Sequence, residues 1–190
     1  MPRATHDTSA ILDAAGRILG ADGPAKVTMA AVIREAGVPS GSLYYRFPDR
    51  PALLAALWNR AIASYHSDAY PLFDRDPVEA AAALAAYTVR WCEAEPAHAH
   101  VLLAGRSRFD AEAWPEAARE AEAAESARWN EAIRGLTRRV RATTSVTTTE
   151  LLLVVVDLPY AAVRRYLSGG RPIPPDLADV VTGIVRTSLG

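Results

Sequence analysis

The sequence predicts an all-α protein of about nine helices, and three observations support this fold class. Apolar residues recur three and four positions apart along nearly every segment, which is the period of an amphipathic helix. Alanine, which has the highest helix propensity, is abundant throughout the chain. Apolar and polar residues nowhere alternate over a stretch that would predict a β-strand.

Capping residues define the first two helices. The first begins at Thr8 or Ser9, carries apolar residues on one face and ends near Gly20. The second begins at the N-cap Thr28 and ends at Gly37, because glycine readily adopts the left-handed backbone that terminates a helix. The second helix is therefore predicted to be short.

Prolines separate the helices that follow. A third helix begins after the turn at Pro39 and ends before Pro48. Asp49 then caps a long fourth helix, in which Pro51 occupies the first turn, where proline is tolerated. After a proline-flanked break at residues 71–77, five more helices are predicted, at about residues 78–95, 96–103, 115–141, 147–167 and 175–189.

The composition is that of an ordinary globular protein. Of the 190 residues, 50% are hydrophobic and 23% are charged, and the formal net charge is −1. A disordered chain would have lower hydrophobicity and a higher net charge. The near-zero net charge also excludes a protein that holds nucleic acid through bulk charge alone. The charge is nevertheless uneven, because residues 1–60 have seven basic and five acidic side chains, whereas the remainder has 14 and 17.

Other features exclude several classes of site. Cys92 is the single cysteine, so neither an intramolecular disulfide nor a Cys-rich zinc site can form. The sequence has no glycine-rich phosphate loop and no nucleophile elbow, so we expect no enzyme, no cofactor and no metal. The N-terminus lacks the apolar core of a signal peptide, and the longest apolar run, Leu151–Val156, is far shorter than the roughly 20 residues of a membrane span. We therefore expect a cytoplasmic protein that does not bind membranes.

Residues 28–47 fit a helix-turn-helix. Two short helices are joined by a tight turn containing glycine, and in such motifs the second helix enters the DNA major groove. Leu43 and Phe47 are four residues apart, so both are expected to hold this second helix against the core. Four side chains are then left nearer the DNA, namely Ser40, Ser42, Tyr44 and Tyr45. The alternative is that the tyrosines are core residues of a small helical domain and the neighbouring arginines are solvated.

The segment from Thr28 to Leu54 resembles the DNA-binding signature of the TetR family of transcriptional repressors. The matching residues are Thr28, Ala36, Gly37, Val38, Gly41, Leu43, Tyr44, Phe47, Arg50, Ala52, Leu53 and Leu54. The resemblance implies that Ser40, the Gly41 backbone and Tyr45 approach base edges, which determine operator choice. It implies phosphate contacts for Thr28, Ser42, Tyr44, Arg46 and Arg50. Ile33 departs from the family, which usually has a small residue at this position, and should separate or rotate the two helices slightly.

The resemblance also implies a DNA-binding domain over residues 1–50 and a ligand-binding and dimerisation domain over residues 51–190. Apolar residues at helical spacing in the last two helices are candidates for a dimer interface, unless they pack inward. These candidates are Leu151, Val155, Leu158, Val180, Val181, Ile184 and Val185.

A pocket for a hydrophobic inducer is expected among the middle helices, where aromatic residues gather. The candidates are Tyr65, Tyr87, Trp91, Leu103, Phe109, Trp129, Asp157 and Tyr160, although for any single apolar one the pattern favours a place in the core. Asp157 directly follows an apolar run, so we interpret it as a helix cap, as a partner of Arg106 or Arg164, or as a ligand contact.

Taken together, these patterns predict a DNA-binding transcriptional regulator. It would act as a repressor that binds a palindromic double-stranded DNA operator as a homodimer and is released by a small hydrophobic ligand. The alternatives are a helical ligand-binding or protein-interaction module without DNA binding, and an enzyme that uses the apolar pocket.

Overall fold

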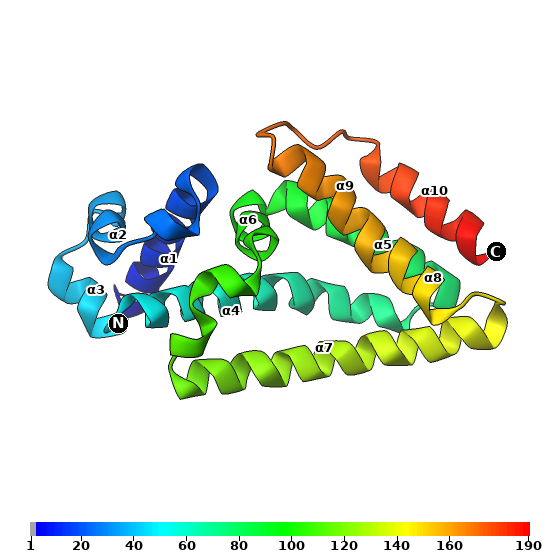
Figure 1. Cartoon of the computed structure of the whole chain (residues 1–190), viewed down its shortest axis with the longest axis horizontal. Helices are drawn as coiled ribbons and strands as arrows, with labels where there is room; N and C mark the ends of the chain where they lie inside the picture. The colour runs from blue at the N-terminus through cyan, green and yellow to red at the C-terminus, as the bar shows by residue number, and fades with distance from the viewer. Residues whose placement is uncertain (1–2) are drawn as a thin grey trace. The chain divides into compact units, whose positions relative to one another are not determined.

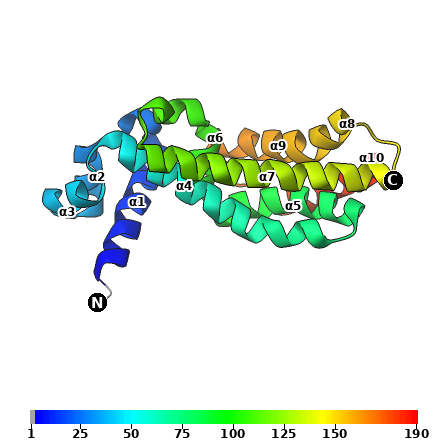
Figure 2. The ribbon, with the colours of Figure 1, turned by 90° about the horizontal axis from the view of Figure 1, so that it is seen from below.

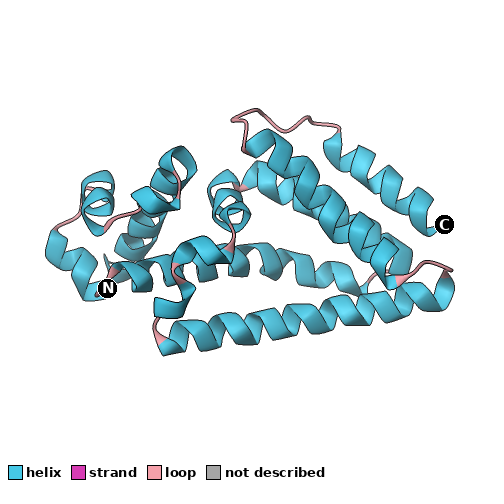
Figure 3. Ribbon diagram, in the orientation of Figure 1, coloured by secondary structure: helices cyan, strands magenta, loops and turns pink. Residues whose placement is uncertain are grey.

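The computed structural model describes residues 3–190, with side chains from Thr8 onward, and all regular elements in this range are helical (Figures 1 and 3). The α-helices are α1 (Arg3–Asp22), α2 (Met29–Ala36), α3 (Ser40–Arg46), α4 (Arg50–Ala69), α5 (Pro77–Ala94), α6 (Pro96–Ala104), α7 (Glu116–Thr143), α8 (Thr148–Leu152), α9 (Leu158–Leu167) and α10 (Leu177–Leu189). A π-helical segment, η5 (Leu153–Asp157), joins α8 and α9 into one continuous helix. The prediction of an all-α chain of about nine helices is confirmed for the described residues.

Short 3₁₀ helices occupy four of the connections. They are η1 (Pro24–Lys26), η2 (Tyr70–Asp74), η3 (Arg106–Phe109) and η4 (Ala111–Ala113). Two of them begin with or contain a proline, which fits the first turn of a helix because it has no backbone N–H to satisfy.

The residues form two units, and each is described by itself. Unit 1 comprises residues 1–64 and 97–124, and unit 2 comprises residues 65–96 and 125–190. Helices α4 and α7 contribute residues to both. The predicted division after residue 50 concerns function rather than packing, and it stays a prediction.

The capping signals place the helix-turn-helix as predicted. The Thr28 hydroxyl oxygen accepts a hydrogen bond from the Ala31 N–H at 3.2 Å and caps α2. Gly37 ends α2 with φ +64°, and its N–H donates to the Ile33 carbonyl at 3.0 Å. A side chain at Gly37 would be strained in this backbone conformation, so the glycine permits the sharp turn into α3.

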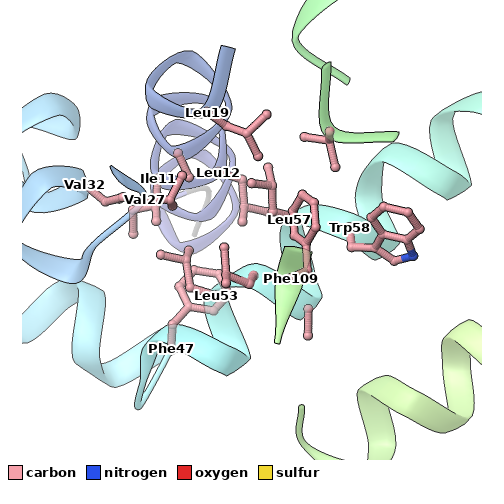
Figure 4. Close-up of a cluster of buried hydrophobic side chains, with 14 of the residues drawn as sticks. Ile11, Leu12, Leu19, Val27, Val32, Phe47, Leu53, Leu57, Trp58 and Phe109 are labelled. Atoms are coloured by element: carbon pink, nitrogen blue, oxygen red, sulfur yellow. The ribbon is translucent and has the colours of Figure 1, made fainter. Parts of the chain in front are cut away.

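The core of unit 1 fixes α3. Figure 4 shows side chains from α1, α2 and α4 meeting in one apolar cluster, with the Phe109 ring beside Trp58. Leu43 is fully buried and Phe47 is 7% exposed, so both hold α3 to this cluster as predicted. Figure 2 shows the α2–α3 pair lying to one side of α1. Ile33 is half-buried and packs on the same cluster.

In unit 2, α5 lies side by side with α9 and α10 (Figure 1). Five alanines of α5 are at most 3% exposed, and such small side chains allow close approach of neighbouring helices; they are Ala80, Ala81, Ala82, Ala85 and Ala86. Val181 and Val185 of α10 are buried here, at 1% and 0% exposed.

The π-helical segment explains how one long helix accommodates Pro159. Proline lacks an N–H, and its ring collides with the carbonyl four residues earlier in a regular helix. The wider π turn over Leu153–Asp157 comes directly before this position and relieves both constraints. The predicted cap at Asp157 is wrong, because its side chain is exposed and makes no capping hydrogen bond.

Candidate nucleic-acid interface and ligand site

Helix α3 presents a polar and aromatic surface opposite its buried side. Tyr44 is 50% exposed and Tyr45 is 87% exposed, although large aromatic side chains are usually largely buried. Ser40 and Gly41 are also exposed, and Ser42 is half-buried. The residues predicted to approach base edges therefore lie on one accessible surface of unit 1.

Thr28 and Arg46 flank this surface. The Thr28 side chain is exposed, and because its oxygen accepts the capping hydrogen bond, its own proton can still be donated to another group. The Arg46 guanidinium donates to the Ser42 carbonyl at 2.9 Å, to the Ser42 hydroxyl at 2.8 Å and to the Thr8 hydroxyl at 3.2 Å. Arg46 therefore joins α3 to α1 and also orients Ser42.

Arg50 is placed differently from the expected phosphate ligand. Its Nε donates to the Val27 carbonyl at 2.8 Å, and its Nη2 donates to the Pro24 carbonyl at 3.0 Å. Its Nη1 forms an ion pair with the Asp110 carboxylate. The sequence offered no sign of these partners, because the carbonyls carry no side-chain signal and Asp110 lies 60 residues away.

Four of the predicted ligand residues meet in unit 2. The Tyr65 ring centroid lies 5.3 Å from that of Tyr87, 5.1 Å from that of Trp91 and 5.6 Å from that of Trp129. Three further rings complete what we call the aromatic cluster, and they are His66, Tyr70 and Phe73. Sequence reasoning missed these three, although the density of aromatic residues between positions 65 and 73 is a signal for them.

A carboxylate lies inside the aromatic cluster. Glu125 Oε1 accepts hydrogen bonds from His66 Nδ1–H and from the Tyr70 hydroxyl, each at 2.7 Å. The His66 ring stacks on Trp129 with centroids 4.1 Å apart and planes 3° apart, and the Arg128 guanidinium lies 4.0 Å from the Tyr70 ring centroid. Sequence periodicity does not single out Glu125 among the acidic residues of α7.

The surroundings shift the pKa values of these groups. Burial lowers the pKa of His66, so the imidazole is held neutral. Burial alone would raise the pKa of Glu125, but the hydrogen bonds from Tyr70 and His66 outweigh it and keep that pKa below its usual range. Burial and the bond to Glu125 raise the pKa of Tyr70 to about 12.

The other four predicted ligand residues lie elsewhere. Phe109 is fully buried in the core of unit 1, and Leu103 is half-buried on α6 in the same unit. Asp157 and Tyr160 are exposed on the continuous helix of unit 2. Tyr87 also lines a groove of about 320 Å³ formed by residues of α5 and α10.

The residues predicted to form the dimer interface lie partly in the interior and partly on the surface of unit 2. Leu151, Val155, Val181 and Val185 are at most 5% exposed, so their assignment to a surface contact is wrong. Leu158 is half-buried. Five large apolar side chains of the same helices are 39–55% exposed and form what we call the exposed apolar face, namely Leu153, Val156, Tyr160, Val180 and Ile184. Periodicity locates both sides of such a helix but does not say which side meets α5.

Three further observations concern other kinds of site. Among the residues with described side chains, no group of three or more His, Cys, Asp or Glu residues is arranged to hold a metal ion. No helix in the described part of the chain is long and apolar enough to cross a membrane. Cys92 is buried, and burial raises the pKa of its thiol to about 12, opposite to what a reactive thiolate requires.

Comparison with known proteins adds a family match and a fold match. Residues 11–57 match the family model of bacterial regulatory proteins, tetR family. No curated relative matches the sequence. The fold is similar to that of a TetR family transcription regulator from Marinobacter aquaeolei VT8, with 18% identity, a TM-score of 0.75, and 98% of this chain and 96% of the other covered.

Two other similar structures hold ligands. The transcriptional regulator FadR from Bacillus subtilis, in complex with stearoyl-CoA, is 12% identical with a TM-score of 0.68, and 95% of this chain and 98% of the other are covered. The multidrug binding protein EbrR, complexed with ethidium, is 23% identical with a TM-score of 0.56, and 100% of this chain and 99% of the other are covered. At these identities the similarity establishes the fold.

The buried imidazole predicts a pH dependence of stability. Because the folded-state pKa of His66 is lowered, the unfolded chain takes up the proton first, and the free energy of unfolding falls as the pH drops below about 6.5. Glu125 adds a second decline below its usual value of 4.5. Urea denaturation between pH 8 and pH 5, at about half-unit steps, should show a smaller decline in the variant His66→Gln than in the wild type. If the free energy of unfolding fell equally with pH in the two proteins, the protonation of His66 would not be linked to folding.

Proposed function

We propose that the chain, whose residues 11–57 match the tetR family model and whose fold is similar to that of a TetR family regulator, represses transcription by binding a palindromic operator as a homodimer. Helix α3 enters the major groove of each half-site. The observation that supports this most directly is the contrast within α3, where Leu43 is buried while its neighbours Tyr44 and Tyr45 are exposed. Two aromatic side chains that stay exposed in the folded protein are accounted for if they contact DNA.

The contacts to DNA divide into two groups. Ser40, the Gly41 backbone and Tyr45 approach base edges, and they determine which operator is bound. Thr28, Ser42, Tyr44 and Arg46 lie around them and contact phosphates, which set the position of the protein on the duplex. Because Arg46 already bonds Ser42, these two side chains approach the backbone as one unit.

Replacing the most exposed aromatic residue of α3 tests this proposal. The variant Tyr45→Ala should lower affinity for the operator by about 1–3 kcal/mol, or roughly 5- to 150-fold, and leave affinity for scrambled DNA nearly unchanged. Its stability should stay close to that of the wild type, because an 87% exposed side chain contributes little to the core. Fluorescence anisotropy with palindromes from the DNA flanking the gene measures both affinities.

Tyr166→Ala, which removes a tyrosine from α9, is the control and should leave both affinities unchanged. If the wild-type protein shifted no palindrome at low or moderate salt, DNA binding itself would be contradicted, and the reading as a helical ligand-binding module would be favoured.

The exposed apolar face is the proposed dimer interface. Leu153, Val156 and Tyr160 lie on the continuous helix, Val180 and Ile184 lie on α10, and α10 contacts the π-helical segment between α8 and α9. Side chains of this size are normally covered, and a two-fold axis covers the same surface on both subunits at once. Two-fold symmetry also matches a palindromic operator.

A charge in this surface should separate the subunits. Ile184→Glu would bury an unpaired carboxylate at the interface, at a cost of about 3–5 kcal/mol, so the variant should be monomeric in analytical ultracentrifugation and bind its operator weakly. Ala127→Glu makes the same charge change at an exposed position of α7 and should remain dimeric. A dimeric Ile184→Glu would place the interface elsewhere.

The aromatic cluster is the proposed site for a small hydrophobic inducer. Its rings offer flat apolar surface, and Glu125 offers one fixed carboxylate among them, which together suit an apolar or aromatic molecule. The ligands of FadR and EbrR, stearoyl-CoA and ethidium, make both of these reasonable probes. An inducer that binds more tightly to the form of the dimer unable to reach both half-sites would release the DNA.

Removing one ring should weaken whichever probe binds. Trp129→Ala should lower the affinity for ethidium or stearoyl-CoA at least about tenfold, because Trp129 contacts four other rings of the cluster, whereas Trp129→Phe should retain most of it. Isothermal titration calorimetry measures the affinities. Equal binding to the Trp129→Ala variant and the wild type would show that the probe occupies another site.

A further inference from the structure

We propose that Arg50 is a positioning residue for the DNA-binding helices and not a phosphate ligand, and that Asp110 controls it. This inference rests on the proposed DNA binding, and it assigns a role in that binding to the segment Gly105–Trp114, which we call the connector. The connector joins α6 to α7 and contains η3 and η4.

The hydrogen bonds of Arg50 converge on the turn before α2. Val27 and Pro24, whose carbonyls it holds, belong to the turn that leads from α1 into the N-cap Thr28. The guanidinium is a rigid planar fork, so two carbonyls held by different nitrogens fix the direction in which the chain enters α2. The side chain is 29% exposed, and each of its three nitrogens has a partner within unit 1.

The third partner is held in place by the core. Asp110 lies between η3 and η4 and has a left-handed backbone conformation, with φ +53°. Two buried aromatic residues of the connector, Phe109 before it and Trp114 after it, anchor this segment. Phe109 and Trp114 are at most 2% exposed, the Trp114 indole N–H donates to the Phe109 carbonyl at 2.7 Å, and both rings pack on Trp58 of α4. The carboxylate is therefore presented to Arg50 by a fixed segment rather than by a mobile loop.

The charges also oppose a phosphate contact. A phosphate that approached Arg50 would share the guanidinium with the Asp110 carboxylate, and two anions would compete for one cation. A positioning residue needs the opposite arrangement, in which a nearby carboxylate keeps the guanidinium in place.

Because the connector joins α6 to α7, movement of either helix affects the ion pair between Arg50 and Asp110. A displacement of α6 or of the first turns of α7 moves the two buried anchors, and Asp110 moves with them. Arg50 then loses one of its three partners, and the turn before α2 is held less firmly. The connector thereby couples the helices that it joins to the orientation of α2 and α3.

Removing the charge of Asp110 distinguishes a positioning role of Arg50 from a phosphate contact, because the two roles predict opposite changes in operator affinity. If Arg50 positions the helices, Asp110→Asn should weaken operator binding about tenfold, without changing the slope of log affinity against log salt. If Arg50 bound a phosphate, Asp110→Asn would free the guanidinium, so that binding would strengthen and the slope would steepen. Glu112→Gln is the matched control, since it removes the same charge from an exposed position of the connector and should change affinity less than about twofold.

Two substitutions at Arg50 complete the test. Arg50→Lys keeps the charge but loses the fork, so it should weaken operator binding as much as Arg50→Ala. Neither should reduce the salt slope, whereas loss of a phosphate contact would reduce it by about one. Retained affinity in Arg50→Lys, or a reduced slope in Arg50→Ala, would overturn the proposal.

A measurement without DNA separates failure of this inference from failure of the proposed function. Hydrogen exchange at the amides of Val27 and Thr28, which bond Pro24 and Lys26, should be faster in Asp110→Asn and Arg50→Ala than in the wild type and in Glu112→Gln. Unchanged exchange in both variants contradicts the positioning role. If exchange were faster in both variants but the wild-type protein bound no operator DNA, the operator proposal would be contradicted. The role of Arg50 in holding the turn before α2 would still stand.

Discussion

The burial of Leu43 and Phe47 is the constraint on which the rest of the proposed DNA-binding surface depends. Helix α3 has seven residues, and a helix of this length is not stable alone in water. Its conformation therefore comes from the two apolar anchors that it inserts into the core of unit 1. The same anchoring determines which side remains outside, so the exposure of Tyr45 follows from the burial of Leu43 two positions earlier.

The elements whose causes are local were predictable from the sequence. Thr28 and Gly37 bound α2 because a hydroxyl cap and a left-handed glycine act within four residues of themselves. The helical period likewise gave most long helices to within a few residues of their ends, but the predicted start of the first helix at Thr8 or Ser9 is wrong, because α1 begins at Arg3. The interruption before Pro159 was not predicted, because a single proline is compatible with a kink, a new helix start or a π turn, and only the packing of the whole helix selects among them.

The types of residue in the candidate sites were predictable from the sequence, but the residues that contact one another were not. The aromatic residues of the middle helices were identified, yet Phe109 belongs to the core of unit 1 while Trp129 belongs to the aromatic cluster of unit 2. Arg50 is the clearest case, since a basic residue in a DNA-binding signature predicts a phosphate contact until its three partners are known. Contacts between residues tens of positions apart leave no periodic signal, because periodicity reports only which residues share a face.

The π-helical segment also determines what the exposed apolar face contains. A π turn accommodates one more residue than an α turn, so the residues after Asp157 are rotated by about 100° relative to the place that the same sequence would give them in an uninterrupted α-helix. Leu153 and Val156 lie within the π-helical segment, and Tyr160 follows it. A deletion of one residue within Leu153–Asp157 would remove the π turn and keep α9 in its orientation, whereas an uninterrupted α-helix over the full sequence would turn α9 about its axis. The composition of the surface available to a second subunit is thus set by the π turn in this helix as much as by the identity of its side chains.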